Sequence, residues 1–165
     1  MSRIRTLAVL TILSTLVAGC GGGGSGVTDP DGLVRFKIPA GWEVRSEANG
    51  TRLGRIEPAG ERTVLMVNAR PLDEGETAAS VRDLRISQIE AQSGELTIDR
   101  LDERAGVTTW ESLHESPPDS TRPWMHAIHR FSPDLHVEVA LIASPDKHAD
   151  YVDDLESVAE SVKPL

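Results

Sequence analysis

The chain has almost no cysteine and few aromatic residues. Cys20 is the single cysteine among 165 residues, so an internal disulfide is excluded. Aromatic side chains make up 4% of the sequence, and three of them are tryptophans. Because an indole ring buries a large area, we expect Trp42, Trp110 and Trp124 to lie in the core. A chain of this length accommodates a single domain.

Basic residues are also scarce. The sequence has 26 acidic residues against 17 basic ones and a formal net charge of −9. Subtracting the two positive charges of Arg3 and Arg5, which lie in a segment that we expect to be removed, takes −9 to −11. Binding to nucleic acid requires clustered Lys and Arg that neutralise phosphates, and no basic run is present. We therefore expect no nucleic-acid partner.

The common catalytic signatures are missing as well. The sequence has no G-x-S-x-G, H-E-x-x-H, Walker or C-x-x-C pattern, and its glycine run precedes every predicted strand. We therefore expect no enzyme, no catalytic residue and no cofactor. A Ser/His/Asp site assembled only by folding stays open as the alternative, because such a triad is recognised by its geometry and not by its order in the sequence.

The first nineteen residues have the pattern of a signal peptide. Arg3 and Arg5 precede an apolar run over residues 6–17. This run has the length of a signal-peptide core and falls short of the roughly 20 residues that cross a bilayer. We expect residues 1–19 to be removed on export.

Cys20 follows a short stretch of small residues. Val17, Ala18 and Gly19 directly precede it, and this segment resembles the lipobox of bacterial lipoproteins, in which Leu is usual where Val17 stands. The resemblance implies cleavage before Cys20 and attachment of fatty acyl chains, palmitate among them, to its sulfur. The alternative is an ordinary secretory signal, with Cys20 left free or lost.

Residues 20–32 have the composition of a tether. Residues 21–26 read GGGGSG and cannot pack, because glycine keeps maximal backbone freedom; with residues 27–32 they predict a flexible spacer. Acyl chains would hold the protein on a membrane, since each buried methylene contributes about 0.8 kcal/mol. Gly21, in place of Asp, resembles the pattern of lipoproteins sent to the outer membrane of two-membrane bacteria, where the domain would face the periplasm. In a one-membrane bacterium we expect the outer face of the cell membrane.

Residues 33–165 predict one α+β domain. A helix is expected over residues 77–92, with Thr77 as its cap and a broad apolar face. A second helix starts with Ser144 as cap and Pro145 in the first turn, and its other face is acidic. Strands between them predict an antiparallel sheet with helices packed on it. Apolar alternation and the Asn49-Gly50 turn place these strands at 33–38, 42–46, 51–57, 62–70, 95–102, 106–114, 123–131 and 135–143.

Two segments carry a family resemblance. FKIPAGW at residues 36–42 and SPDKHADYVDDLESVAESVK at residues 144–163, together with the order of elements, resemble the Mog/PsbP-like family. This family groups the PsbP protein of photosystem II, the Ran-binding Mog protein and many bacterial lipoproteins without assigned roles. The resemblance implies an α/β/α sandwich with accessory or binding roles. None of the family's functional residues can be carried onto a matching position of this chain.

The polar residues give no clear metal site. His126 and His129 are three residues apart in a predicted strand and should lie on opposite faces, so we expect two separate surface or edge histidines. Nothing in the sequence suggests that folding gathers the other three, His114, His136 and His148. Residues 29–32 begin like a calcium loop but lack its later ligands, so a polar turn is expected. We expect the acidic face of the last helix to be exposed to solvent.

These observations predict a membrane-anchored envelope lipoprotein whose domain is a non-catalytic accessory or binding module. Its partner would be another envelope protein or a small ligand. If a protein docks, the proline-stiffened loop over residues 116–122 is the first place to expect it. Two alternatives remain open: an envelope hydrolase with a Ser/His/Asp site assembled in space, and a weak metal-binding protein.

Overall fold

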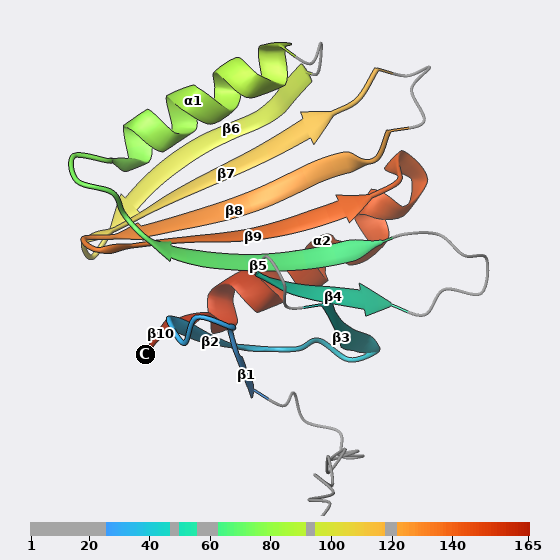
Figure 1. Cartoon of the computed structure of the whole chain (residues 1–165). Helices are drawn as coiled ribbons and strands as arrows, with labels where there is room; N and C mark the ends of the chain where they lie inside the picture. Colours follow the sequence, from blue (N-terminus) through green and yellow to red (C-terminus); the bar gives the residue numbers. More distant parts are fainter. Residues whose placement is uncertain (1–25, 47–49, 56–62, 92–94, 118–121) are drawn as a thin grey trace, which may run out of the picture.

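The computed structural model describes residues 26–46, 50–55, 63–91, 95–117 and 122–165 (Figure 1). The predicted signal peptide, Cys20, Asn49 and residues 118–121 of the predicted docking loop lie outside these ranges, so what was expected of them stays a prediction. Neither described helix combines the length and the apolar character that a bilayer span needs.

Seven antiparallel strands form the main sheet, in the order β3-β4-β5-β9-β8-β7-β6. Strands β3 to β5 pair in chain order, as do β6 to β9, and β5 pairs with β9 in the middle of the sheet. Each strand corresponds to one expected from apolar alternation. Their bounds are β3 Trp42–Ser46, β4 Thr51–Arg55, β5 Val64–Pro71, β6 Glu95–Arg104, β7 Val107–Glu115, β8 Trp124–Ser132 and β9 Leu135–Ala143.

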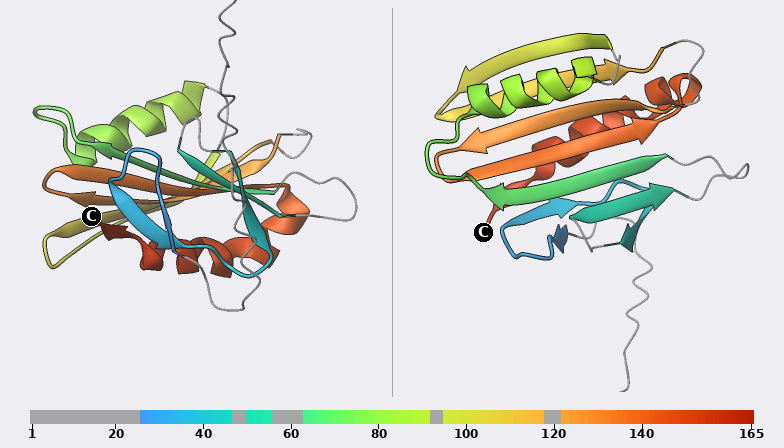
Figure 2. Two further views of the ribbon diagram at one scale, coloured as in Figure 1. Left: turned by 60° about the horizontal axis from the view of Figure 1, so that its bottom comes forward. Right: turned by 45° about the horizontal axis from the view of Figure 1, so that its top comes forward.

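The two helices cover opposite faces of this sheet (Figures 1 and 2). Helix α2 (Pro145–Ser161) packs on β8 and β9, and helix α1 (Ala78–Ala91) packs on β6 and β7. The α+β prediction, an antiparallel sheet with helices packed on it, is confirmed, and the layers have the α/β/α order that the family resemblance implied.

A second, three-stranded sheet lies beside α2. It has the order β1-β2-β10, with β1 at Gly26–Thr28, β2 at Val34–Lys37 and β10 at Lys163–Pro164. The prediction that the tether extends to residue 32 is therefore wrong for residues 26–32, which form β1 and a turn. Asp29 holds this turn, because its side-chain oxygens accept the N–H groups of Val34 (2.6 Å) and Asp31 (3.1 Å). The polar turn expected at residues 29–32 is confirmed.

The main core lies between the sheet, α2 and the small sheet. Leu155 and Val158 of α2 are fully buried there, and burial of each such side chain stabilises the fold by roughly 1.5–3 kcal/mol. Trp42 belongs to this core, whereas Trp110 is buried on the opposite face, under α1. Trp124, also expected in the core, is only half-buried.

The helix ends and faces match the predictions in part. Thr77 caps α1, since its Oγ1 accepts the N–H of Ser80 and Ser80 Oγ accepts the N–H of Thr77. Ser144 precedes α2 but makes no capping hydrogen bond with its side chain. The broad apolar face predicted for α1 is wrong, because Ile89 is its single buried residue and the Leu84 side chain is 61% exposed.

Candidate binding groove beneath helix α1

A groove of about 340 Å³ runs between α1 and the sheet. Because α1 packs on the outer strands β6 and β7, it leaves parts of β5 and β9 beside it as the floor of the groove, as the right-hand view of Figure 2 lets the reader follow. The groove is lined by Asn68, Arg70, Glu76, Val81, Leu84, Arg85, Gln88, His136 and Glu138.

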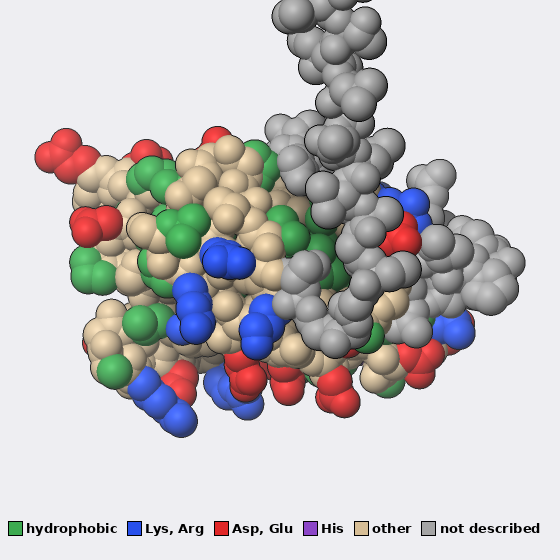
Figure 3. Space-filling model, turned by 90° about the horizontal axis from the view of Figure 1, so that it is seen from below, with side chains coloured by type: hydrophobic (Ala, Val, Ile, Leu, Met, Phe, Trp, Pro, Cys, Tyr) green, Lys and Arg blue, Asp and Glu red, His purple; other side chains and the backbone are tan. Residues whose placement is uncertain are grey.

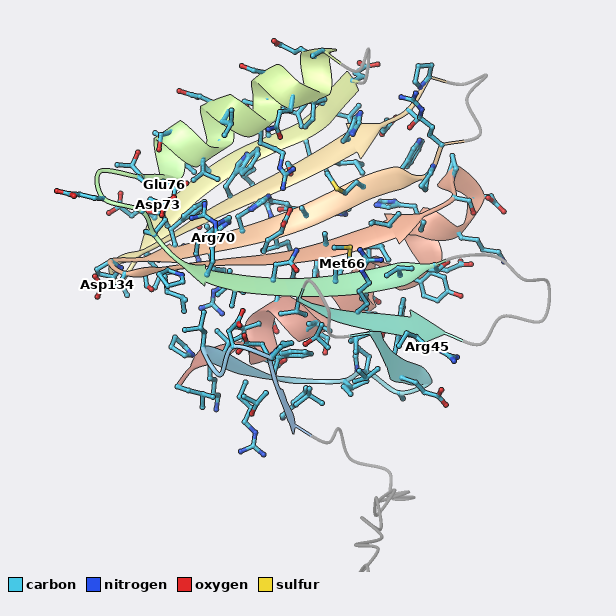
Figure 4. All side chains as sticks on the ribbon, viewed as in Figure 1. Arg45, Met66, Arg70, Asp73, Glu76 and Asp134 are labelled. Carbon is cyan, nitrogen blue, oxygen red and sulfur yellow. The ribbon has the colours of Figure 1, made fainter. Side chains whose placement is uncertain are left out.

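An ion pair lies at the end of the groove next to the turn between β5 and α1 (Figure 4). Arg70 Nη1 and Nη2 donate to Glu76 Oε2 (2.6 Å) and Oε1 (2.7 Å), and the N–H of Asp73 donates to the same carboxylate (3.1 Å). The hydrogen bonds from Arg70 and then from Asp73 lower the pKa of Glu76 to about 2. The turn is also joined to the β8–β9 hairpin, because Leu72 N–H donates to the carbonyl of Asp134.

A second ion pair connects α1 to the middle of the sheet. Arg85 Nη2 on α1 donates to Glu138 Oε1 on β9 at 2.9 Å, and Asn68 Nδ2 on β5 donates to the other oxygen of Glu138 at 3.3 Å. The Glu138 side chain is only 12% exposed, so its charge is matched by one guanidinium and one amide in a nearly dry setting.

A stacked pair of histidines lies under α1. His129 Nδ1 on β8 is 3.0 Å from His136 Nε2 on β9, Trp110 stacks on His129, and Phe131 stacks on His136, each at 4.5 Å between ring centres. Burial lowers the pKa of His129 to about 3 and that of His136 to about 4, so both rings are neutral at pH 7. His129 Nε2 is buried without a hydrogen-bond partner among the described residues and lies 3.9 Å from Glu138 Oε1.

The other histidine pair lies on the opposite face of the sheet, beside α2. His126 Nδ1 is 3.1 Å from His148 Nε2, and His126 Nε2 is 3.0 Å from Glu111 Oε1. The prediction that His126 and His129 lie on opposite faces is confirmed. The prediction of two separate surface histidines is wrong, because these side chains are 3% and 1% exposed and each is paired with a further histidine.

The pairing of His129 with His136 depends on the length of one turn. The β8–β9 hairpin turns at Pro133 and Asp134, and its register places His129 opposite Glu138 and Phe131 opposite His136. The strand ends predicted at residues 131 and 135 leave three residues between them, and this register, shifted by one residue, puts His129 and His136 on opposite faces. His148 reaches His126 only because α2 packs on β8, which no local pattern indicates.

Neither histidine pair includes a serine or a cysteine in the part of the chain that the structure describes. The described residues also contain no group of three or more His, Cys, Asp or Glu side chains arranged to hold a metal ion. His114, on β7, belongs to neither pair.

A larger hollow, of about 830 Å³, lies on the other face between α2 and strands β6 to β8. Its arginines are engaged in contacts within the protein: Arg100 pairs with Glu111, and Arg104 Nε lies 2.8 Å from Asp102 Oδ2. Arg130 Nη1 donates to a carbonyl oxygen of α2 at 3.0 Å. The first of these contacts joins β6 to β7, the second lies within β6, and the third joins β8 to α2.

Comparison with known proteins gives the fold. No family model and no curated protein matches the sequence. The structure is similar to that of the cyanobacterial PsbP protein CyanoP from Synechocystis sp. PCC 6803, with a TM-score of 0.60 and 16% identity over 90% of this chain and 99% of that one. It is also similar to LpqN of Mycobacterium tuberculosis, which is involved in cell envelope biogenesis, with a TM-score of 0.59 and 12% identity over 86% of this chain and 90% of LpqN. The chain therefore has a PsbP-like fold.

Proposed function

We propose that the chain is an exported lipoprotein, anchored through Cys20, whose domain is a non-catalytic accessory module of the cell envelope that binds its ligand or partner in the groove beneath α1. The signal-peptide and lipobox patterns support export and anchoring. The involvement of LpqN in cell envelope biogenesis supports an envelope role for a domain of the same fold.

The observation that carries the proposal is the apolar lip of a polar groove. Leu84 projects from α1 beside the groove with 61% of its surface exposed, and Val81 lies one turn before it. A large apolar side chain next to fixed hydrogen-bonding groups is typical of binding sites, in which apolar contacts give affinity and a few polar groups give orientation.

The charges of the groove favour an uncharged occupant. The guanidinium groups of Arg70 and Arg85 are matched by the carboxylates of Glu76 and Glu138, and His136 is neutral. A charged ligand would have to break one of these pairs and leave a partly buried charge unmatched, which is unfavourable. We therefore infer a neutral, hydrogen-bonding ligand or peptide segment with one apolar side.

The buried histidines favour binding over catalysis. A general base is most effective when its pKa lies near the working pH. The pKa values of about 3 for His129 and about 4 for His136 make both poor bases at neutral pH. Both rings are also held between aromatic neighbours, as expected of side chains that support the floor of a site.

Photo-crosslinking in intact cells tests the groove. A photoreactive phenylalanine analogue would replace Leu84 in one strain and Leu101 in another, because Leu101 is a leucine of similar exposure (52%) on the outer strand β6. We expect a specific adduct from position 84 and none from position 101. Adducts of equal yield from both positions, or none from position 84, would argue against the groove.

Labelling with radioactive palmitate tests the anchor separately. The unaltered chain should take up label and stay with the membrane fraction through a carbonate wash. Cys20→Ser should take up none and move to the soluble fraction, because the acyl chains provide the hold on the bilayer. An unaltered chain that takes up no label would overturn the anchoring part of the proposal while leaving the groove to its own test.

A further inference from the structure

The outer face of the small sheet carries three cations. In β2, Val34 and Phe36 point into the core, so Arg35 and Lys37 point outward and are exposed. Lys163 of β10 is the direct cross-strand partner of Arg35 and is also exposed. We call Arg35, Lys37 and Lys163 the cationic face.

Among the described residues, no ion pair neutralises the cationic face. None of the ion pairs among the described residues includes Arg35, Lys37 or Lys163. Like charges directly opposite one another in a sheet are unfavourable, so the placement of Lys163 against Arg35 favours an anion in front of them. In a chain with a net charge of −9, such a face is unusual. Seen from this side, several Lys and Arg side chains gather near the middle of the molecule, and most Asp and Glu side chains lie around its edges (Figure 3).

The chain enters the domain at this face. Gly26 begins β1 and pairs with Lys37, and the side chain of Arg35 passes so close over Gly26 that a Cβ there would lie 2.6 Å from Arg35 Nε. Cys20 precedes Gly26 by six positions. A chain of that length spans at most ~20 Å when fully extended, so an anchored Cys20 keeps the cationic face close to the membrane.

We propose that the cationic face rests on the anionic phospholipid headgroups of the membrane that holds the anchor. The inference rests on the proposed lipidation of Cys20, which sets the distance. Acidic residues of α2 that lie farther than about 10 Å from the surface are screened at ~0.1 M salt, whereas Glu160, three positions before Lys163, weakens the contact. The domain then has a fixed orientation, with the small sheet against the bilayer and α1 with β6 on its far side (Figure 1).

Vesicle sedimentation of the unlipidated Cys20→Ser chain tests the contact without the anchor. Vesicles of phosphatidylcholine with and without phosphatidylglycerol serve as the probe, at low salt. We expect binding to the anionic vesicles only, weakened by added salt. Lys37→Glu/Lys163→Glu should reduce the partition coefficient by about tenfold or more, because each basic residue near an anionic surface contributes measurably to binding. Arg104→Glu/Arg122→Glu, the same change in net charge elsewhere on the domain, should reduce it far less.

A second measurement uses the lipidated chain in vesicles. Thr28 is exposed on the outer face of the small sheet, opposite Arg35, and Glu103 is exposed on β6. A nitroxide on Thr28→Cys should be relaxed by nickel chelated at the headgroups far more strongly than one on Glu103→Cys, and the difference should shrink in Lys37→Glu/Lys163→Glu.

Three outcomes would overturn the inference: equal binding to neutral and anionic vesicles, equal losses in the two double variants, or equal relaxation at positions 28 and 103. If Lys37→Glu/Lys163→Glu loses crosslinks to an envelope protein but still binds vesicles, the cationic face contacts a protein and not the headgroups. If the unaltered chain washes off the vesicles, the proposed anchor fails, and the sedimentation result still decides the headgroup contact.

Discussion

Trp42 Nε1 donates a hydrogen bond of 2.7 Å to Asp154 Oδ2, which joins β3 at the edge of the main sheet to helix α2. The indole also packs edge-on against Tyr151, with 5.6 Å between ring centres. Gly41 directly precedes this tryptophan with a φ of 83°, a left-handed conformation that suits glycine, and so lets the chain turn from Pro39 into β3.

Trp42→Phe should lower the free energy of unfolding by about 2 kcal/mol, because it removes both a hydrogen bond to a charged group and part of the buried area. Urea denaturation measures the change. Trp124→Phe is the matched control. Because Trp124 is only half-buried, this change should lower the free energy of unfolding by less than half as much as Trp42→Phe. Equal losses at the two positions would show that the link between β3 and α2 contributes little.

Arg85→Ala should destabilise the domain by about 2 kcal/mol, because it leaves the nearly buried Glu138 carboxylate with only the Asn68 amide as a partner. Glu138→Gln added to Arg85→Ala should restore part of the loss, since the double variant no longer has an unmatched charge. Arg104→Ala removes an arginine whose side chain is 85% exposed and should change stability by less than ~0.5 kcal/mol. A double variant less stable than Arg85→Ala would contradict this account.

Stability should depend on pH between about pH 6.5 and pH 4. The folded chain holds the pKa of His129 near 3 and that of His136 near 4, below the ordinary 6.5, so the unfolded chain binds more protons in this window. The free energy of unfolding is therefore at its full value above pH 6.5 and falls as the pH drops, by roughly 1.4 kcal/mol per pH unit for each histidine. NMR titration checks the cause: the imidazole signals of His129 and His136 should not shift until about pH 4. Titration of either ring near pH 6.5 would refute it.

Leu84→Ser should leave the free energy of unfolding within ~0.5 kcal/mol of the unaltered value, because its side chain is exposed. It should nevertheless reduce the yield of adducts from a photoreactive residue at Gln88, which also lines the groove. Ile89→Ala, on the buried side of the same helix, should lower stability by about 3 kcal/mol. A variant at Leu84 with normal adduct yield would mean that the lip takes no part in binding.

The sequence predicted the elements whose pattern is local. Apolar alternation located β2 to β9, and the segment around Pro145 located α2, because these periodicities arise within each element. It missed β1 and β10, which are two or three residues long, contain glycine or proline, and exist only because β2 pairs with both. The groove was missed for a related reason: whether Leu84 faces solvent or the core depends on where α1 packs on the sheet, which its own sequence does not encode.

The three pairs that hold β1 against β2 have a mechanical consequence. In a chain anchored through Cys20 as proposed, a pull from the bilayer would enter the domain at Gly26 and load this short ladder first, whereas the core behind Val34 and Phe36 would be loaded only through β2. Detachment of β1 and the Asp29 turn from β2 would free residues 26–32 and lengthen the segment between Cys20 and the domain by roughly 20 Å, while the seven-stranded sheet stays intact. With the proposed anchor, β1 would therefore set how far the domain can reach from the membrane.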